Sequence, residues 1–332
     1  MLCFGSHAAS ERAASAPELL NLGVSYARQG HYDKAEKTYR KALSIHPGYI
    51  PGEVDLGLAY FKEGKYKSAI PWLERAEKQG ISSDQIHTLL GMSFYALKEY
   101  RGAAPHFRVL FNRKPDNATA QYFLAESYLR SHQTKDVSEL FKELGEDFPG
   151  SPVIHMIAGE RYDQLGRISK AIDEFQKAAA ISPKMPFVHF ALGYLYWEQR
   201  RFAPAASEFR LEIEIPFGEA DQAKGYLGDI AFREGGRSAE RMLLGVTEKA
   251  PDVRIAQYDL GNIYSKQGQL KKAARCFSVA IKLDPKRADA YYRLARICRR
   301  RGQSARARKL FGRVTALHAS KHVSILRAMG RP

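Results

Sequence analysis

The sequence has little cysteine and no long apolar run. Its 332 residues include only three cysteines, Cys3, Cys276 and Cys298. A sparse and odd set of cysteines argues against a disulfide framework and favours a reducing compartment. No run approaches the roughly 18 apolar residues of a membrane-spanning helix, and no charged start with an apolar core or lipid-attachment box opens the chain. We therefore predict a cytoplasmic protein without a transmembrane segment, and periplasmic residence stays open if the N-terminus is incomplete.

The common local signatures of catalysis are also missing. A phosphate-binding GxxxxGKS or GxxxxGKT, a GxGxxG after a strand, HExxH, paired CxxC and GxSxG are all absent. His318 and His322 have the i, i+4 spacing of a helical metal pair, but no third ligand lies near them in the sequence. We therefore predict that the protein is not an enzyme and has no catalytic residue, no cofactor and no metal ion.

What the sequence does contain is a folded composition arranged in a repeat. Hydrophobic residues make up 45% and charged residues 27%, which is typical of globular chains. A small residue, usually in a Leu-Gly pair, recurs every 34 residues, and a ring follows it three residues later in most periods. A fixed period of this length indicates stacked supersecondary units. The rings are Tyr26, Tyr60, Phe94, Tyr128, Tyr162, Tyr196 and Tyr264.

Each period has the pattern of a helical hairpin. Apolar residues at helical spacing fill the first half, and a turn that often carries a glycine, such as Gly30 or Gly64, comes next. A second amphipathic helix then ends near a proline such as Pro47. Small residues let two helices approach closely, and rings fill the space beside them. Because one hairpin cannot bury its own apolar stripe, neighbouring hairpins must stack.

These landmarks resemble those of the tetratricopeptide repeat (TPR) family. The resemblance implies an all-α, right-handed superhelical solenoid of antiparallel helix hairpins. The seventh unit departs from the pattern, because Leu227-Gly228 lies one residue late and Ala231 replaces the ring. We predict a poorly ordered N-terminal stub at 1–15, nine units over 16–321 with starts at 16, 50, 84, 118, 152, 186, 220, 254 and 288, and a basic tail at 322–332.

The same resemblance implies a concave groove lined by the first helix of each unit. The second, fifth, ninth and twelfth places of a unit then point inward, and many of them hold rings. An apolar and aromatic stripe is typical of a groove that binds an extended peptide or a partner helix, and acids within it favour a partner with positive charge. The alternative is that these rings bury themselves against adjacent helices or the chain's own ends. The predicted groove residues are Phe61, Tyr95, Tyr122, Glu126, Met156, Glu160, Asp163, Phe187, Phe190, Tyr194, Trp197, Tyr258 and Asn262.

Charge is concentrated at the C-terminal end. Residues 266–332 hold 19 Lys and Arg residues but only two acids, Asp284 and Asp289, so this segment has a net charge of +17 and accounts for the whole excess of +16 in the chain. A polar cap on the last repeat is one interpretation. The near absence of acids equally fits a functional patch for an acidic protein, for RNA or DNA phosphates, or for an anionic membrane surface. The predicted basic patch is Arg293, Arg296, Arg299, Arg300, Arg306 and Arg308.

Three histidines occupy equivalent places in the repeat. His87, His155 and His189 each stand fourth in their units, a place that in the family packs against the neighbouring hairpin. We interpret them as structural residues rather than as ligands.

The predicted function is that of a protein–protein interaction scaffold or adaptor that holds a peptide or partner helix in its concave face. One alternative is nucleic-acid or anionic-surface binding through the basic C-terminal repeats. Another is a regulatory TPR arm of a multi-subunit enzyme.

Overall fold

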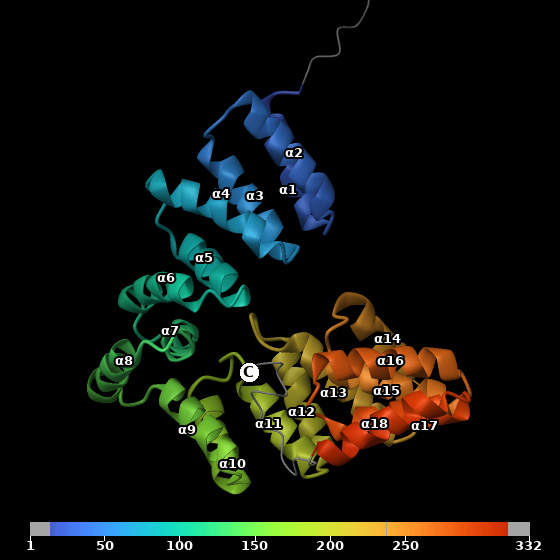
Figure 1. Cartoon of the computed structure of the whole chain (residues 1–332). Coiled ribbons are helices and arrows are strands. Elements are labelled where there is room, and N and C mark those ends of the chain that lie inside the picture. The colour runs from blue at the N-terminus through green and yellow to red at the C-terminus, as the bar shows by residue number, and fades with distance from the viewer. Residues whose placement is uncertain (1–13, 237, 318–332) are drawn as a thin grey trace, which may run out of the picture. The chain divides into compact units, whose positions relative to one another are not determined.

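The computed structural model describes residues 14–236 and 238–317. Within these ranges the chain forms eighteen α-helices and no β-strand, so the predicted all-α fold of helical hairpins is confirmed (Figure 1). None of the helices described is both long and apolar enough to cross a membrane. The predicted basic tail, and residues 1–13 of the predicted stub, lie outside the described residues. The chain divides into two units, Met1–Phe148 and Pro149–Pro332, and each is considered by itself.

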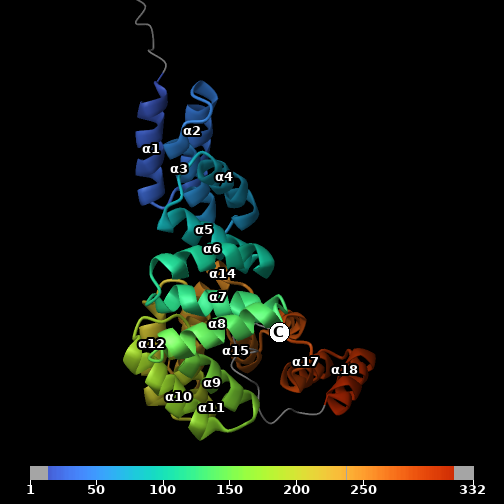
Figure 2. The same ribbon diagram turned by 90° about the vertical axis from the view of Figure 1, so that its left-hand side faces the viewer.

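Unit 1 contains four consecutive hairpins. Each odd-numbered helix packs against the even-numbered helix that follows it, and first helices of successive hairpins also touch, α1 with α3 and α3 with α5. Figure 2 shows the same pairs from a second direction. The helices are α1 Ala16–Arg28, α2 Tyr32–Ile45, α3 Ile50–Lys62, α4 Tyr66–Lys78, α5 Asp84–Ala96, α6 Tyr100–Arg113, α7 Ala118–Arg130 and α8 Thr134–Asp147.

Unit 2 continues the pattern with five hairpins. Its first helices also contact one another, as in α13 with α15 and α15 with α17. The helices are α9 Pro152–Gln164, α10 Ile168–Ile181, α11 Val188–Glu198, α12 Phe202–Ile213, α13 Ala220–Arg233, α14 Ala239–Lys249, α15 Arg254–Lys266, α16 Leu270–Leu283, α17 Ala288–Arg300 and α18 Ser304–Ala316.

The repeated small residue allows the two helices of a hairpin to approach closely. A Cβ atom added to Gly23 of α1 would lie 2.4 Å from a ring carbon of Tyr39 on α2. In unit 2, a Cβ added to Gly159 of α9 would lie 2.6 Å from the ring of Phe175 on α10. No real side chain tolerates such distances, so glycine is required where the ring of the second helix covers the first.

The turn inside each hairpin needs a left-handed backbone. Gly30 has φ 76° and Gly166 has φ 69°, values that glycine adopts without steric cost. Where the sequence has no glycine, Lys98, His132 and Arg200 take the same conformation, with φ between 57° and 63°. The fold therefore imposes this conformation on whichever residue occupies the turn.

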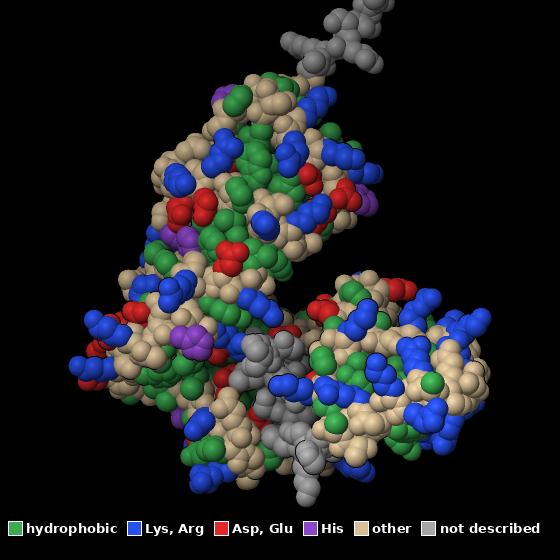
Figure 3. All heavy atoms as spheres, viewed as in Figure 1, with side chains coloured by type: hydrophobic (Ala, Val, Ile, Leu, Met, Phe, Trp, Pro, Cys, Tyr) green, Lys and Arg blue, Asp and Glu red, His purple; other side chains and the backbone are tan. Residues whose placement is uncertain are grey.

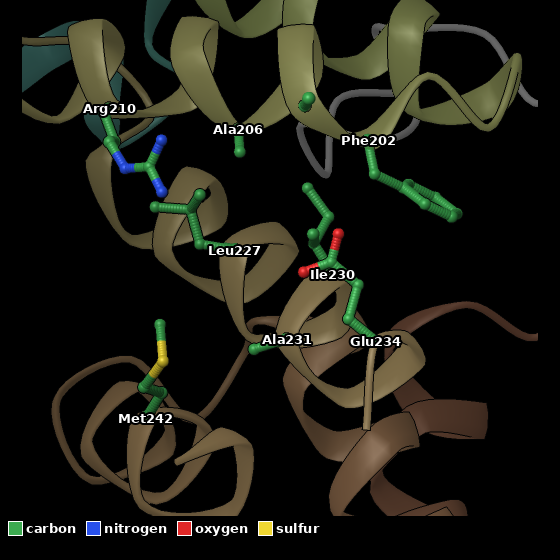
Figure 4. A pocket seen from close by; sticks show the side chains of 9 residues that line it. Phe202, Ala206, Arg210, Leu227, Ile230, Ala231, Glu234 and Met242 are labelled. Atoms are coloured by element: carbon green, nitrogen blue, oxygen red, sulfur yellow. The ribbon is translucent and has the colours of Figure 1, made fainter. Parts of the chain in front are cut away.

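The irregular seventh unit leaves a pocket beside α13. Ala231 stands where most other units have a ring, and a hollow of about 440 Å³ opens next to it (Figure 4). Leu227 and Ile230 of α13 also line it, as does Glu234 directly after that helix. The remaining labelled walls are Phe202, Ala206 and Arg210 of α12 and Met242 of α14.

Candidate functional site

The first helices of unit 1 carry a row of half-buried apolar side chains. Val54, Leu58 and Phe61 lie on α3, while Met92 and Tyr95 lie on α5, and all five keep part of their surface exposed. We refer to these five residues as the apolar row. The three residues of α3 pack against the hydrophobic core of the unit, which fixes their positions. Figure 3 shows hydrophobic side chains gathered over α1 to α5.

Ring pairs hold the two aromatic members of the row. Phe61 contacts Tyr66 edge to face, with ring centroids 5.4 Å apart. Tyr95 contacts Tyr100 in the same way at 5.3 Å. Because such contacts restrict the rings before any partner arrives, a partner would meet ordered anchors.

The inner face of α7 is more deeply buried. Tyr122 is fully buried and packs edge to face on Phe123, with centroids 5.6 Å apart. Glu126 is also buried, and its Oε2 accepts hydrogen bonds from Arg130 Nε at 2.6 Å and from Tyr95 OH at 3.3 Å. Its carboxylate is thus engaged within the unit.

In unit 2, the predicted groove residues of α9 are likewise buried. Met156 has no exposed surface, and Glu160 and Asp163 keep 6% and 1% of theirs. Carboxylates buried to this degree are held by the protein and present little surface to a partner.

The rings near α11 are covered by a neighbouring hairpin. Phe187, Phe190 and Tyr194 are buried. Phe190 and Tyr194 each meet Tyr226 of α13 edge to face, with centroids 5.7 Å and 5.8 Å apart. Burial raises the pKa of Tyr194, so its hydroxyl stays protonated, and it donates a hydrogen bond to Glu198.

A buried carboxylate holds the start of α11. Glu212 of α12 has no exposed surface and accepts backbone hydrogen bonds from Phe187 at 3.1 Å, Phe190 at 3.1 Å and Glu219 at 2.8 Å. Phe187 itself adopts a left-handed backbone with φ 72°. A single side chain therefore satisfies amide groups at the starts of two first helices, α11 and α13.

Five residues of unit 2 form a polar network. Asp229 of α13 is buried and accepts hydrogen bonds from the Trp197 indole and from Arg233 Nε. The guanidinium of Arg233 also lies 5.2 Å from the Trp197 ring centroid, in cation–π contact. On α15, Asn262 donates to Asp259 Oδ1 at 3.3 Å. We call these residues the polar network.

Two carboxylates of this network share a buried space. Asp259 is 2% exposed and Asp229 is fully buried. Burial, and then the charge of Asp229, raise the pKa of Asp259 well above its usual range. Asp229 Oδ1 and Asp259 Oδ2 have no other donor, so a proton held between the two carboxyl groups would satisfy both. The two carboxylates are therefore enclosed, while Arg233 is exposed and Trp197 and Asn262 are half-exposed.

The predicted groove residues thus fall into two groups. Phe61, Tyr95, Trp197, Tyr258 and Asn262 are half-buried, while the other eight are buried. From the sequence we expect an exposed stripe whose rings are not needed for packing. The structure differs for the eight buried residues, because rings such as Phe190 and Tyr194 fill the contact between hairpins. The eight are Tyr122, Glu126, Met156, Glu160, Asp163, Phe187, Phe190 and Tyr194.

The six arginines of the predicted basic patch all lie exposed on α17 and α18. None of them pairs with a carboxylate among the described residues, although Arg293 donates to Tyr258 OH at 3.4 Å. Figure 3 shows Lys and Arg side chains crowded over the C-terminal helices. A hollow of about 620 Å³ between α17 and α18 adds Tyr291, Lys309 and Arg313 beside Arg306. We call the six arginines the basic surface.

The equivalent histidines contact the second helix of their own hairpin. His155 Nδ1 lies 2.7 Å from Glu174 Oε2, and His189 Nδ1 lies 2.6 Å from Glu208 Oε2. Burial opposes the charged form of His189, but the bonds to Glu208 and to the Pro183 carbonyl outweigh it and raise its pKa. These two histidines contact the second helix of their own hairpin, whereas from the sequence we expect contact with the neighbouring hairpin. His318 and His322 lie outside the described residues.

Comparison with known proteins assigns the family. Models described as tetratricopeptide repeat or TPR repeat match residues 16–49, 54–78, 94–160, 159–199 and 258–320. These matches, with the helical hairpins, show that the chain belongs to the tetratricopeptide repeat family. Family and fold support a protein–protein interaction scaffold as the general class of function. The comparison with curated proteins gives no match.

Several solved structures are similar to this chain at low sequence identity. The hetero-tetramer Cut9–Hcn1 of the APC/C matches with 15% identity and a TM-score of 0.55, over 94% of this chain and 69% of that one. Yeast Tom70 matches with 17% identity and a TM-score of 0.42, over 96% and 88%. YrrB, titled a TPR protein with an unusual peptide-binding site, matches with 19% identity and a TM-score of 0.41, over 56% and 92%.

Proposed function

We propose that the protein is a scaffold that binds an extended peptide or a partner helix on the first helices of unit 1, through the apolar row. The observation that carries this proposal is the set of five apolar side chains, on two adjacent first helices, that are ordered but not fully covered. Half-exposed apolar and aromatic side chains of this kind are the usual anchors of protein recognition. The proposal assigns the chain no catalytic step.

Stacked hairpins make such a surface effective. The core of unit 1 fixes Phe61, and ring contacts fix both Phe61 and Tyr95. Binding then costs the scaffold little side-chain entropy, so most of the free energy of burying the anchors is available for affinity. Trp197, Tyr258 and Asn262 are the corresponding candidates in unit 2, and the buried groove residues hold both surfaces in shape.

Affinity purification with mass spectrometry tests the proposal. The tagged wild-type chain is compared with Phe61→Ala/Tyr95→Ala, and with Ile45→Ala as a matched control. Ile45 is 53% exposed on the second helix α2 of the same unit. Partners should be retained by the control and lost from the double variant, with unchanged helicity by circular dichroism. The proposal would be wrong if the double variant and the Ile45→Ala control recovered every partner equally.

A second variant keeps the test decisive if the double variant unfolds. Met92→Lys places a charge within the row at a half-exposed position, where a long side chain can reach water. This variant should remain folded and still lose the partner. Retention of the partner by folded Met92→Lys would count against the row as the binding surface.

The basic surface supports a second candidate function, which is binding to an acidic protein or to nucleic-acid phosphates. The supporting observation is that six exposed guanidinium groups have no carboxylate partner within the described residues. Arginine in this state readily forms bidentate bonds with phosphate or carboxylate.

Fluorescence anisotropy with labelled RNA, DNA and an acidic peptide distinguishes these partners. Arg299→Glu/Arg306→Glu/Arg308→Glu should abolish binding, while Arg161→Glu/Arg167→Glu/Arg241→Glu, three exposed arginines elsewhere in unit 2, should not. Phosphate binding predicts a steep fall of affinity with salt. Equal binding by the two triple variants, or no binding at low salt, would exclude this candidate.

A further inference from the structure

Three side chains from three helices of unit 1 bring metal-ligating atoms together. Glu77 comes from α4, His87 from α5 and His106 from α6. We propose that these three residues form a binding site for a divalent transition-metal ion of the Zn²⁺ class. The site is separate from the apolar row and from the basic surface, and it links the second hairpin of the unit to the third.

The distances between the three donor atoms fit one small ion. His87 Nδ1 lies 3.2 Å from His106 Nδ1 and 3.3 Å from Glu77 Oε1. His106 Nδ1 lies 3.6 Å from the same oxygen. Ligand atoms about 2.1 Å from a tetrahedral Zn²⁺ are about 3.4 Å from one another. The three spacings therefore match three corners of a tetrahedron of that size.

The type of donor also selects the class of ion. Two imidazoles and one carboxylate suit Zn²⁺, and other first-row transition metals, better than Ca²⁺ or Mg²⁺, which prefer oxygen donors alone. Burial lowers the pKa of His106 to about 4 and also lowers that of His87. Burial therefore favours the neutral form of both rings, which is the form that binds a metal.

Neighbouring groups hold the two rings in orientation. Ser82 Oγ lies 2.8 Å from His87 Nε2 and accepts a hydrogen bond from Arg113 Nη2, also at 2.8 Å. With the metal on Nδ1, Nε2 would carry the proton and donate a hydrogen bond to Ser82 Oγ, and metal-bound histidines generally donate such a bond from their other ring nitrogen. The His106 ring stacks on Phe94, with centroids 5.8 Å apart and planes 8° from parallel.

The third hairpin differs from two other hairpins in the residue that faces its fourth-place histidine. In each of them the histidine in the fourth place pairs with a glutamate in the twenty-third place, as His155 does with Glu174. In the third hairpin the twenty-third place holds His106, and Glu77 of the preceding hairpin supplies the carboxylate. The result is three donors instead of two. A metal ion bound there would join α4 to α5 and α6, and α5 also carries Met92 and Tyr95 of the apolar row.

Zn²⁺ titration of the full chain by calorimetry tests the site. The protein is used without a histidine tag, after treatment with a chelator, and in a His318→Ala/His322→Ala background that removes the other histidine pair. We expect one equivalent of Zn²⁺ to bind. His106→Gln and Glu77→Gln should each weaken binding at least about a hundredfold, and Ser82→Ala by about 10–100-fold. His155→Ala, at the equivalent place of another hairpin, should leave affinity unchanged.

Co²⁺ provides a spectroscopic readout for the same variants. Bound Co²⁺ should give visible absorption bands of a four- or five-coordinate ion, and Glu77→Gln should abolish them. Because the Glu77 side chain is 29% exposed, this variant is expected to fold even if His106→Gln does not. The proposal is overturned if the background protein binds no stoichiometric Zn²⁺, or if Glu77→Gln and His155→Ala bind it equally.

Discussion

The two units build their first-helix surfaces from the same hairpin but with different side chains. In unit 1 the inward places of α3 and α5 hold apolar residues that stay half exposed. In unit 2 the corresponding region of α11, α13 and α15 holds the polar network, with Asp229 and Asp259 fully or almost fully buried. Repeated packing positions thus determine the hairpin, whereas the inward places determine the chemistry of each surface. Variants that affect one unit alone can test this separation.

The chain offers one fluorescent reporter for each unit. It has two tryptophans, Trp72 in unit 1 and Trp197 in unit 2. Urea unfolding of a Trp72→Phe background therefore follows unit 2, and a Trp197→Phe background follows unit 1. With these two backgrounds the stability of each unit can be measured by itself.

The largest expected effect is that of Glu212→Ala on unit 2. The change leaves three backbone N–H groups without their acceptor, and each unsatisfied buried group costs about 1 kcal/mol or more. The free energy of unfolding reported by Trp197 should fall by about 3 kcal/mol, while that reported by Trp72 should not change. Glu214→Ala, at an exposed position two residues away, is the control. A loss shared equally by both reporters would show that the units are not energetically separate.

Asp259→Asn should remove a pH dependence that belongs to unit 2. The pKa of Asp259 is raised above 3.8 in the folded chain, so its contribution to stability is complete below that pH. As the pH rises from there towards the folded pKa, the contribution declines by about 1.4 kcal/mol for each pH unit. Asparagine keeps a donor towards Asp229 without titrating.

Urea midpoints of the Trp72→Phe background at several pH values measure this effect. The decline with rising pH should disappear in Asp259→Asn and persist in Asp252→Asn, an exposed control. If the stability of both variants declined equally with rising pH, the proposal that Asp229 and Asp259 share a proton would be wrong.

Filling the pocket beside α13 should stabilise unit 2 more modestly. Ala231→Phe restores a ring where the seventh unit lacks one, and it would bury apolar surface against Leu227 and Met242. We expect a gain of about 1 kcal/mol in the unfolding free energy reported by Trp197. Ala180→Phe, at an exposed place on α10, should give none. A destabilised Ala231→Phe would mean that the pocket walls cannot accept the ring.

The smallest expected effect comes from placing glycine at a left-handed turn residue, and it should be equal in the two units. His132→Gly in unit 1 and Arg200→Gly in unit 2 relieve a left-handed turn residue, with φ 57° and 61°. Each should stabilise its own unit by about 0.5–1 kcal/mol in urea unfolding. The reverse change, Gly64→Ala, should cost unit 1 a similar amount. Unequal gains would indicate that the shared turn is not equivalent in the two units.

The features that follow from local sequence could be predicted. The contact of Gly23 with Tyr39 depends on residues of one hairpin, and the 34-residue period places both. Most first helices begin where that period puts the unit starts. Helix α11 begins later, at Val188, because the left-handed Phe187 precedes it.

The features that depend on contacts between hairpins could not be predicted. Tyr226 of the next hairpin covers Phe190 and Tyr194, and the periodicity of the sequence does not predict that contact. The cluster of Glu77, His87 and His106 was missed for the same reason, since its carboxylate comes from the preceding hairpin. The pairing of the fourth place with the twenty-third, visible in His155 and Glu174, was the one signal that could have pointed to His106.

The hairpin turns have a practical consequence for labelling. At Gly30, Gly64, Gly166 and Gly268 an added Cβ atom would meet nothing within 4 Å. Only the conformational preference of the backbone opposes substitution there, and Lys98 and Arg200 show that the fold overcomes it. In a background without the three native cysteines, cysteines introduced at these turns would give one dye attachment point per chosen hairpin. Fluorescence energy transfer between them could then measure distances between hairpins in solution.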